Sequence, residues 1–323
     1  MSTTIALVGL GRISKRHIEA IAANPRLKIV QVCDVKKEKA QKAALALNCP
    51  FCTDYKTIRG AEIISVLTPS GMHPLHAQEI ANATDCRYIV VEKPIALHGN
   101  EADALFDGVA KAGKTLLPVF QNRYNPLVVF LKELVASGRL GRVYSFVCNV
   151  LWSRDANYFA DDWHGTLAVD GGVLFTQASH YIDMVHFLFG QLQSYTGKGA
   201  NERGYEIYDT HSMSLHFKNG VIGSINSTIS VYRQNYMTEF TLMAEKGTIR
   251  LSGTNLNKVE FWDVEGMEKP NKDFAIDHIY GKGHDTMYQY ILDGSFEMFP
   301  KREEVVSGIR LMEDLSFQVL TKR

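Results

Sequence analysis

The sequence has no excess of charge of either sign and no long apolar run. Lysine and arginine together number 35, as do aspartate and glutamate, so the formal net charge at pH 7 is zero. A neutral chain is not drawn to the phosphates of nucleic acid or to an anionic membrane, so we expect neither as a partner. No apolar stretch of the sequence approaches the roughly 18 to 20 residues that span a bilayer. Any acidic ligand must therefore be held by a local site.

Cysteine is scarce, and its pattern argues against a disulfide framework. The five cysteines are an odd number, and the first residues run directly into an apolar strand at Ile5–Val8 with no secretory leader, so we expect a reducing cytoplasm. Cys49 and Cys52 form a C-x-x-C pair, a pattern found in redox pairs and in half of a zinc site. Because no second C-x-x-C completes a metal site, we interpret both as small buried apolar side chains.

The sequence does contain enough apolar residues, 46% of 323, to build two domains. In its first part, short apolar runs alternate with helical stretches, which is typical of a parallel sheet built from βαβ units. The predicted strands are Ile5–Val8, Ile29–Cys33, Ile63–Leu67, Tyr88–Val91 and Leu116–Phe120, and the predicted helices are Ser14–Ala23, Lys36–Leu47, Pro74–Asn82 and Asn100–Ala112. Residues 1–121 are therefore predicted to form a doubly wound α/β domain of the Rossmann type.

After Pro126 the pattern changes to strands joined by tight turns. Asn219-Gly220 between two alternating strands is one of the strongest short hairpin signals, and Lys246-Gly247 marks a second turn. The predicted strands are Val143–Arg154, Ser212–Phe217, Val221–Ser230, Phe240–Ala244 and Thr248–Leu251, and the predicted helices are Pro126–Ser137, Gly172–Phe189 and about 303–320. Residues 122–323 are thus predicted to be an α+β domain with a large, mainly antiparallel open sheet, on which the last helix packs back.

The loop Gly9-Leu10-Gly11-Arg12-Ile13-Ser14 follows a buried strand and opens a helix, the context in which G-x-G-x-x-G binds a pyrophosphate. Gly9 permits the tight turn, and Gly11 lets the backbone approach the ligand. Ser14 replaces the third glycine, whose role is helix and strand packing, so a small serine can substitute. We expect this loop to bind a dinucleotide.

Asp34 ends the second predicted strand, 20 residues after Ser14. A carboxylate there accepts hydrogen bonds from the adenosine ribose and repels a 2′-phosphate, which favours NAD over NADP. Lys36 and Lys37 follow closely and act against that preference. The alternative is an aspartate that only forms a turn at the end of the strand.

Three further segments resemble the glucose-fructose oxidoreductase, inositol dehydrogenase and rhizopine-catabolism (Gfo/Idh/MocA) family. They are Thr68-Pro69-Ser70-Gly71-Met72-His73-Pro74, Glu92-Lys93-Pro94, and Gly171-Gly172 running to His180-Tyr181-Ile182-Asp183. The resemblance covers nearly the whole chain. It implies a Rossmann domain followed by an open sheet domain, pyranose substrates, and homo-oligomers, dimers or tetramers, that assemble through the sheets.

Other segments are similar to one branch of that family, the bacterial sugar-nucleotide 3-dehydrogenases of lipopolysaccharide synthesis. They are Phe120-Gln121-Asn122-Arg123-Tyr124-Asn125-Pro126, Gly165-Thr166 through Asp170-Gly171-Gly172, and Gly11 to Ser14 with Lys15 and His17. The WlbA and WbpB type of this branch oxidises UDP-N-acetylglucosaminuronic acid at C3′. The resemblance therefore implies a UDP-sugar substrate, and some relatives re-oxidise their cofactor with a 2-oxo acid.

The resemblance and the motifs together give a set of expected NAD contacts. These are Gly9, Gly11, Arg12, Ile13, Asp34, Thr68, Pro69, Ser70, His73, Glu92, Lys93 and Gln121. His73 and His76 have the spacing of a metal pair, but they open a helix in the cofactor loop. We therefore expect no metal.

Lys93 follows a predicted parallel strand, at the edge where open α/β sheets bind their ligands. A lysine beside the cationic nicotinamide should have a lowered pKa, which suits it to accept the proton of a secondary alcohol. The Glu-Lys-Pro context favours this role over a solvated surface charge. Relatives have a cis bond before this proline, so the resemblance implies a cis Lys93–Pro94 bond.

His180, on the predicted helix 172–189, is the second catalytic residue that the resemblance implies. The family usually has an aspartate four residues before this histidine, but Thr176 stands there, with Gln177 beside it. We therefore expect no carboxylate-assisted relay, and the proton transfer falls to Lys93 and His180. Sugar-nucleotide relatives have a similar uncharged replacement.

The substrate's pyrophosphate and carboxylate need local arginines, backbone donors or helix ends. Trp152 and Arg154 alternate along their predicted strand and so point to one face, which suits sugar stacking and an anion contact. The substrate-binding candidates are Arg123, Tyr124, Asn125, Arg154, Trp163, Thr176, Gln177 and His180. Ordinary packing or surface pairing would explain the arginines and aromatic residues among them equally well.

The motifs indicate an NAD-dependent dehydrogenase, and the resemblance implies that it converts UDP-N-acetylglucosaminuronic acid to its 3-keto sugar. One alternative keeps the chemistry and changes the substrate to UDP-N-acetylglucosamine or another pyranose. A second alternative is a non-catalytic NAD-binding sensor on the same scaffold, against which the retention of Lys93 and His180 argues.

Overall fold

The computed structural model describes residues 2–270 and 279–317. The chain divides into two compact units, Met1–Gln121 with Tyr280–Arg302 (unit 1) and Asn122–Ile279 with Glu303–Arg323 (unit 2). Residues 280–302 therefore belong to unit 1, although the sequence analysis placed the whole of 122–323 in the second domain. The reason is a helix that the sequence analysis did not predict, whose side chains hydrogen-bond to helices and strands near the start of the chain.

Unit 1 contains a six-stranded parallel sheet in the order β3-β2-β1-β4-β5-β6. Its strands are β1 (Thr3–Val8), β2 (Leu27–Cys33), β3 (Phe51–Cys52), β4 (Ile63–Val66), β5 (Tyr88–Val91) and β6 (Thr115–Pro118). β4 and β5 are buried along their whole length, as expected for parallel strands covered on both faces. The predicted Rossmann-type fold is confirmed.

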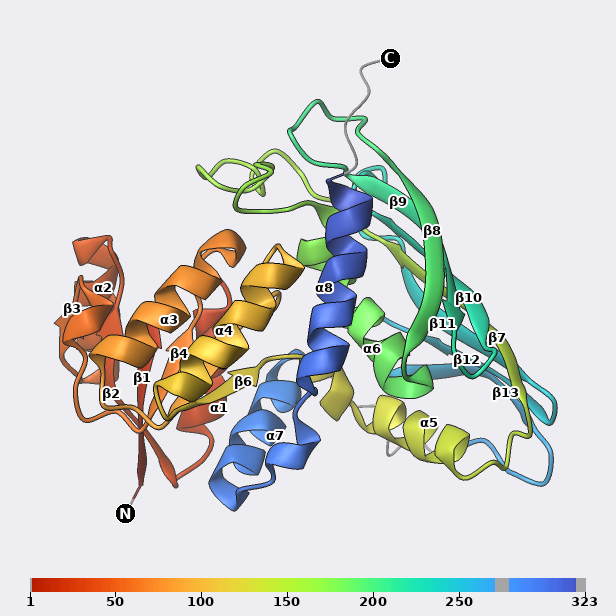
Figure 1. Ribbon diagram of the computed structural model, residues 1–323, viewed down its shortest axis with the longest axis horizontal. Helices are drawn as coiled ribbons and strands as arrows, with labels where there is room; N and C mark the ends of the chain where they lie inside the picture. The colour runs from red at the N-terminus through yellow and green to blue at the C-terminus, as the bar shows by residue number, and fades with distance from the viewer. Residues whose placement is uncertain (1, 271–278, 318–323) are drawn as a thin grey trace. The chain divides into compact units, whose positions relative to one another are not determined.

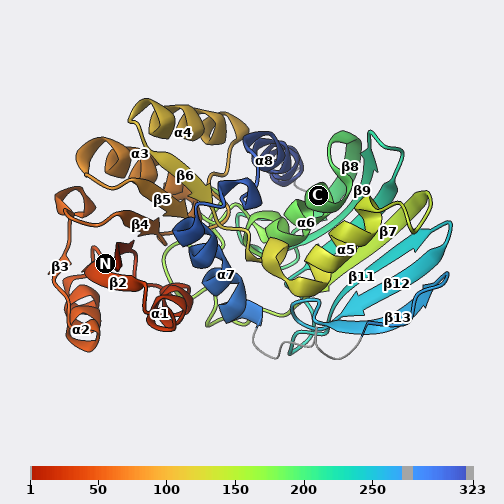
Figure 2. The ribbon, with the colours of Figure 1, turned by 90° about the horizontal axis from the view of Figure 1, so that it is seen from below.

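Helices lie on both sides of this sheet. They are α1 (Ser14–Ala22), α2 (Lys37–Leu47), α3 (His73–Ala83), α4 (Gly99–Lys111) and α7 (Ile279–Asp293). α3 and α4 lie side by side on one face, and α1 and α2 lie on the other (Figures 1 and 2). α7 lies beside α1, because Asn24, just after α1, donates to Gln289 and Tyr288 contacts His17.

Unit 2 contains a seven-stranded sheet in the order β13-β12-β11-β7-β10-β9-β8, in which only the β7–β10 pair is parallel. Its strands are β7 (Val143–Leu151), β8 (Leu192–Ala200), β9 (Thr210–Phe217), β10 (Ile222–Thr228), β11 (Met237–Ala244), β12 (Gly247–Ser252) and β13 (Lys258–Val264). The predicted hairpin joins β9 to β10, with Gly220 at a φ of +87°. The mainly antiparallel sheet is confirmed.

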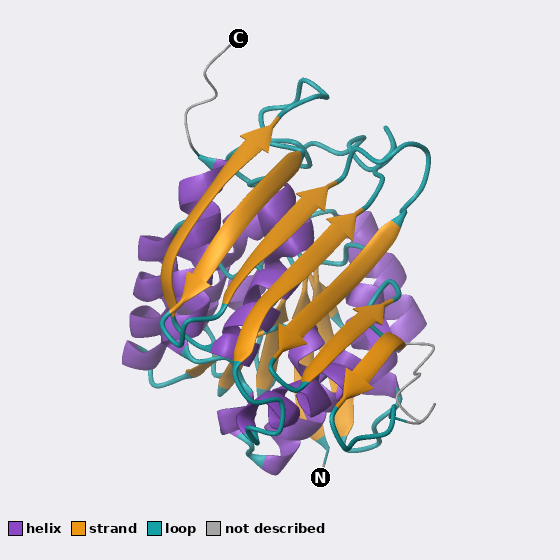
Figure 3. Ribbon diagram, turned by 90° about the vertical axis from the view of Figure 1, so that its right-hand side faces the viewer, coloured by secondary structure: helices purple, strands orange, loops and turns teal. Residues whose placement is uncertain are grey.

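Three helices of unit 2, α5 (Pro126–Ala136), α6 (Ser179–Phe189) and α8 (Arg302–Ser316), pack on one face of this sheet. Phe130 of α5 stacks near Trp262 of β13, and Phe189 of α6 stacks on Phe146 of β7. Tyr195 of β8 donates a hydrogen bond to Asp314 of α8. In the described residues no helix covers the opposite face, which is turned toward the viewer in Figure 3.

Several predicted boundaries differ from the structure. β7 ends at Leu151, and the remainder of the predicted strand continues as irregular backbone with an isolated bridge from Ser153 to Ser230. The predicted helix 172–189 begins as a π-helical segment, Leu174–Ala178, that runs into α6. α8 ends at Ser316, and residues 318–320 of the predicted last helix lie outside the described residues. None of the helices in the described part of the chain is long and apolar enough to cross a membrane.

The cysteines differ from the prediction in burial. All five are free thiols, but Cys49 and Cys52 are half-buried rather than buried, because the short strand β3 lies at the sheet edge. Cys52 pairs in register with Cys33 of β2, and the two thiols form a hydrogen bond. Cys49 and Cys52 are therefore not each other's partners.

Three buried histidines predict acid sensitivity. Burial lowers the pKa of His17, His186 and His211 from 6.5 to about 4, so all three are neutral in the folded protein near pH 7. Below pH 6.5 the unfolded chain binds their protons first, and the free energy of unfolding should fall by about 3 kcal/mol per histidine as the pH drops toward 4. Calorimetry across this range measures the effect. His211→Leu should flatten the pH dependence, and an unchanged slope in that variant would contradict the assignment.

Candidate active site

The glycine loop of unit 1 leaves room for a pyrophosphate. Gly9 has a φ of +93°, and a β-carbon on it would lie 2.7 Å from the carbonyl oxygen of Leu67, so only glycine fits. A β-carbon on Gly11 would have nothing within 4 Å, which is the open approach that a phosphate needs. The Ser14 hydroxyl donates to the Gly11 carbonyl at 2.7 Å and closes the loop at the start of α1. The third position thus tolerates serine.

Asp34 lies at the end of β2 with its carboxylate held in place. Oδ2 accepts from the backbone N–H of Leu10, and Oδ1 from that of Lys36, both at 2.9 Å. The first bond joins the aspartate to the glycine loop, so the groups expected to bind ribose and pyrophosphate form one assembly. Of the flanking residues, Arg12 is exposed, and Ile13 precedes the first turn of α1.

His73 links two of the family motifs. Its Nε2 lies 2.6 Å from the Thr68 carbonyl oxygen and its Nδ1 lies 2.7 Å from the Pro94 carbonyl oxygen. Burial lowers the pKa of His73, and the two carbonyl acceptors oppose this effect because only the doubly protonated ring donates to both. Thr68 also contacts Nδ1 of His76 through its hydroxyl, at 3.0 Å. The two histidines therefore order the loop around Pro69 and Ser70.

Lys93 follows β5, is half-buried, and is joined to Pro94 by a cis peptide bond, as expected. The preceding Glu92 is buried, with 4% of its surface exposed. Its Oε1 lies 3.0 Å from Nε2 of His17 and 2.9 Å from Nε2 of His284, while Oε2 accepts the backbone N–H of Lys93 at 3.1 Å. Glu92 was predicted to contact the cofactor, but both of its carboxylate oxygens bind protein groups.

Gln121 is the last residue of unit 1's first segment and is buried. α7 passes close to it, since a β-carbon on Gly283 would lie 2.6 Å from the Gln121 β-carbon. Sequence reasoning missed α7 altogether, although it supplies His284 and Tyr288 to the surroundings of Glu92.

In unit 2 the π-helical segment carries two candidates and leads into the third. Thr176 donates to the Gly172 carbonyl at 3.0 Å, and His180 lies buried in the first turn of α6. Gln177 is buried, and its Oε1 accepts from Nη2 of Arg154 at 2.8 Å while its Nε2 donates to the Tyr158 hydroxyl at 3.1 Å. π-helical insertions are frequent at functional sites, and this one brings Gln177 against Arg154, in the irregular segment that follows β7.

Arg154 is the centre of a cluster of aromatic side chains. Its guanidinium carbon lies 5.0 Å from the ring centre of Trp152 and 5.3 Å from that of Tyr158. The ring centre of Tyr158 lies 4.2 Å from that of His164, which lies 3.6 Å from that of Trp163. Arg154, Gln177 and Trp163 are therefore brought together through Tyr158, which sequence reasoning did not single out because it lies in an irregular segment.

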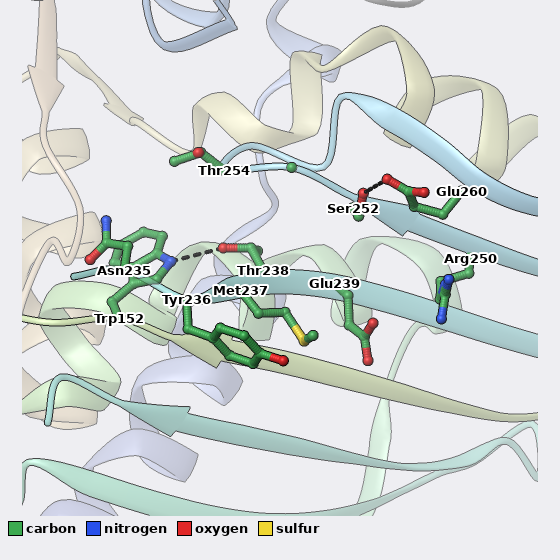
Figure 4. Close-up of a pocket in the computed structure, with 11 residues that line it drawn as sticks. Trp152, Asn235, Tyr236, Met237, Thr238, Glu239, Arg250, Ser252, Thr254 and Glu260 are labelled. Carbon is green, nitrogen blue, oxygen red and sulfur yellow. Dashed lines mark hydrogen bonds between the residues drawn. The ribbon is translucent and has the colours of Figure 1, made fainter. Parts of the chain in front are cut away.

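A hollow of about 390 Å³ adjoins this cluster (Figure 4). It is lined by Trp152, Asn235, Tyr236, Met237, Thr238, Glu239, Arg250, Ser252, Gly253, Thr254 and Glu260. Trp152 donates to Thr238 at 2.8 Å along its wall, and Asn235 accepts from Arg154 at 3.1 Å. Trp152 therefore borders the hollow directly, and Arg154 is linked to its wall through Asn235.

Arg123 and Asn125 bind other protein groups. Arg123 is buried and donates to both oxygens of Asp183 at 2.7 Å and to Glu304 at 2.8 Å. Asn125 accepts the backbone N–H of Leu127 at 2.9 Å, capping α5, and donates to the Asn255 carbonyl at 2.7 Å. A substrate contact by either side chain would compete with these bonds. Tyr124, between them, is buried.

The comparisons with known proteins agree with this architecture. Residues 3–120 match the model of the oxidoreductase family with the NAD-binding Rossmann fold, and residues 128–250 match the GFO/IDH/MocA C-terminal domain. The crystal structure of the WlbA dehydrogenase from Bordetella pertussis in complex with NADH and UDP-GlcNAcA is 34% identical, covers 98% of this chain and 95% of that one, and has a TM-score of 0.87.

Two further relatives differ from each other in their sugar, which is bound in the crystal of one and stated in the name of the other. The WlbA dehydrogenase from Chromobacterium violaceum, also solved with NADH and UDP-GlcNAcA, is 29% identical over 98% of this chain and 96% of that chain, with a TM-score of 0.86. Levoglucosan dehydrogenase from Pseudarthrobacter phenanthrenivorans is 26% identical over 88% of this chain and 79% of its own length. The NAD-binding loops, the two sheets and these matches agree: the chain belongs to the Gfo/Idh/MocA family of NAD-dependent oxidoreductases.

Proposed function

We propose that the protein oxidises the C3′ hydroxyl of UDP-N-acetylglucosaminuronic acid to the 3-keto sugar, in the synthesis of lipopolysaccharide sugars. The observation that carries the proposal is the 34% identity, over nearly the full chain, to a dehydrogenase whose structure holds NADH and UDP-GlcNAcA. The Arg154 cluster of unit 2 supports it, since a guanidinium between aromatic rings suits a sugar that carries a negative charge.

NAD, when bound, supplies the hydride acceptor. Lys93, held at the end of β5, accepts the proton of the sugar hydroxyl. His180, in the first turn of α6, has the second role in proton transfer that the family resemblance implies. Thr176 binds a backbone carbonyl and has no charge, so it takes no proton from either residue. Asp34 binds the adenosine ribose and selects NAD.

Arg154 and Gln177 recognise the C6 carboxylate. The Arg154 side chain is half-buried and already oriented by Gln177 and Asn235, so little rotational freedom is lost when it binds an anion. The sugar ring stacks on Trp152, beside the guanidinium.

The test is a panel of UDP-sugars incubated with the purified protein and NAD, with and without a 2-oxo acid, followed by nicotinamide absorbance and product mass. We expect turnover of UDP-N-acetylglucosaminuronic acid and a product two hydrogens lighter. Turnover of UDP-N-acetylglucosamine alone would favour the first alternative substrate, and turnover of a free pyranose would favour the chemistry of the levoglucosan relative. No turnover of any nucleotide sugar would refute the proposal.

Arg154→Gln is expected to separate substrates by charge. Loss of one charge-assisted interaction should raise KM for the carboxylated sugar by about 10-fold to 100-fold. The KM for UDP-N-acetylglucosamine should stay within about a factor of three of the wild-type value. Arg154→Lys is the matched control, because it keeps the charge but loses the planar guanidinium. Its KM for the carboxylated sugar should lie between the values of the wild type and of Arg154→Gln. Steady-state kinetics on both sugars measures this. An equal rise in KM for both sugars would mean that Arg154 acts in folding or binds the pyrophosphate that the two sugars share.

A further inference from the structure

The surroundings of Glu92 in unit 1 form a closed set of hydrogen bonds. His17, His284 and Tyr288 are each 0% exposed, and they come from α1 and α7. Nδ1 of His17 lies 2.7 Å from the Tyr288 hydroxyl, which lies 2.9 Å from the hydroxyl of Ser65 on β4. Together with the two histidine contacts to Oε1 of Glu92, these bonds join four elements of unit 1 at the start of the Glu92-Lys93-Pro94 motif.

The positions of the protons follow from the acceptors. A carboxylate oxygen only accepts, so Nε2 of both His17 and His284 carries a proton. Neutral His17 then accepts at Nδ1 from the Tyr288 hydroxyl, which accepts from Ser65. Burial raises the pKa of Glu92, but the hydrogen bonds from His17 and His284 outweigh it and hold this pKa well below its usual value. Glu92 is therefore a buried anion held by hydrogen bonds from two histidines.

A metal ion is the competing interpretation of the same cluster. Ligand atoms of His17, Glu92 and His284 all lie within 4.8 Å of one another. Structural zinc takes four protein ligands, and catalytic zinc takes three and a water. Among the described residues this cluster offers three ligand atoms, their side chains are at most 6% exposed, and each atom already has a protein hydrogen-bond partner. The hydrogen-bonded interpretation satisfies every group without an ion.

The cluster is also poorly suited to carry protons. His17, His284, Tyr288 and Ser65 are each 0% exposed, so none of these side chains meets solvent directly. The cluster's bond to the Lys93 segment runs through the backbone, where Oε2 of Glu92 accepts the Lys93 N–H. From the other side, His73 of α3 binds the Pro94 carbonyl. The bonds thus fix the main chain on both sides of Lys93.

We propose that His17, His284 and Tyr288 are positioning residues that hold Glu92 as an anion and thereby set the backbone from which Lys93 reaches the sugar hydroxyl. The proposal rests on the catalytic role given to Lys93 under the proposed function. The ionisable groups around Glu92 are His17 on α1, His284 and Tyr288 on α7, His73 on α3 and Lys93 itself. If a donor is removed, desolvation dominates, Glu92 takes up a proton, and its bond to the Lys93 N–H weakens.

The test compares His284→Leu, which has no donor, with His284→Gln, whose Nε2 amide still reaches Oε1. We expect His284→Leu to lower kcat by about 10-fold to 100-fold at neutral pH, with recovery as the pH rises and Glu92 ionises again. His284→Gln should restore the wild-type pH profile. Infrared spectroscopy of the protein without substrate should show a protonated carboxylic acid in His284→Leu at neutral pH, absent from the wild type and from His284→Leu/Glu92→Gln.

The control is Gln289→Ala, on the same helix, which loses its bond to Asn24 but does not contact Glu92. Its pH profile should match the wild type. A His284→Leu profile parallel to the wild type at every pH, without the infrared band, would overturn the proposal, as would a stoichiometric metal ion in the wild type that His284→Leu loses. Because the band needs no substrate, its appearance without turnover of any sugar would count against the proposed function and still show that His284 holds Glu92 as an anion.

Discussion

Replacing Lys93 with alanine should lower kcat/KM for the nucleotide sugar by about 10²-fold to 10⁴-fold, the range typical of a lost general base. The residue follows β5, where parallel strands present side chains to ligands. Its own backbone N–H donates to the Glu92 carboxylate, and His73 binds the carbonyl of the following Pro94. Such bonds hold the backbone on either side of the residue to a fixed position. Turnover measured by nicotinamide absorbance, with NADH affinity measured by fluorescence, separates a chemical defect from weaker cofactor binding.

Lys93→Arg is the matched control, because it keeps a positive charge that cannot be released at neutral pH. We expect it to be as inactive as Lys93→Ala, while small primary amines should partly rescue the alanine variant alone. If Lys93→Ala left every activity of the protein intact, Lys93 would not be a proton acceptor, and the sensor alternative would gain support.

The local structure around several predicted site residues follows from short segments of the sequence. Gly9 and Gly11 could be identified because a strand, a tight turn and a helix follow one another within a few residues, and Asp34 because it ends the next strand. Lys93 lies directly after β5 for the same reason. In each case the position of the residue depends on a short segment, whose strand, turn and helix pattern can be recognised in the sequence.

The parts that depend on distant contacts were missed. His284 meets Glu92 across 192 positions of sequence, on a helix whose segment reads Gly281-Lys282-Gly283 and so gives a weak helical signal. β8 was overlooked because Gly197 and Gly199 weaken its strand pattern, although close packing against Met213 and Tyr208 requires them to be small. No local pattern predicts such partners, because the tertiary packing creates them.

Arg123 illustrates the same limit, since its motif indicates a substrate contact while its surroundings indicate a buried ion pair. The guanidinium and Asp183 are 4% and 5% exposed, and Glu304 is the more accessible partner at 27%. Burial raises the pKa of Asp183 even though Arg123 opposes the shift, so the carboxylate pays a desolvation cost that the arginine offsets. The three residues join the segment after Gln121 to α6 and α8.

Asp183→Asn should therefore lower the free energy of unfolding of unit 2 by about 3 to 5 kcal/mol, because it leaves a buried guanidinium with one half-exposed partner. The double variant Arg123→Met/Asp183→Leu should lose less than Asp183→Asn, since no charge is then left buried without its partner. Glu304→Gln is the mild control and should cost about 1 kcal/mol or less. Chemical denaturation of the four proteins gives the ranking. A double variant less stable than Asp183→Asn would mean that the pair is net stabilising, and that Arg123 was retained for stability rather than to position α6 and its His180.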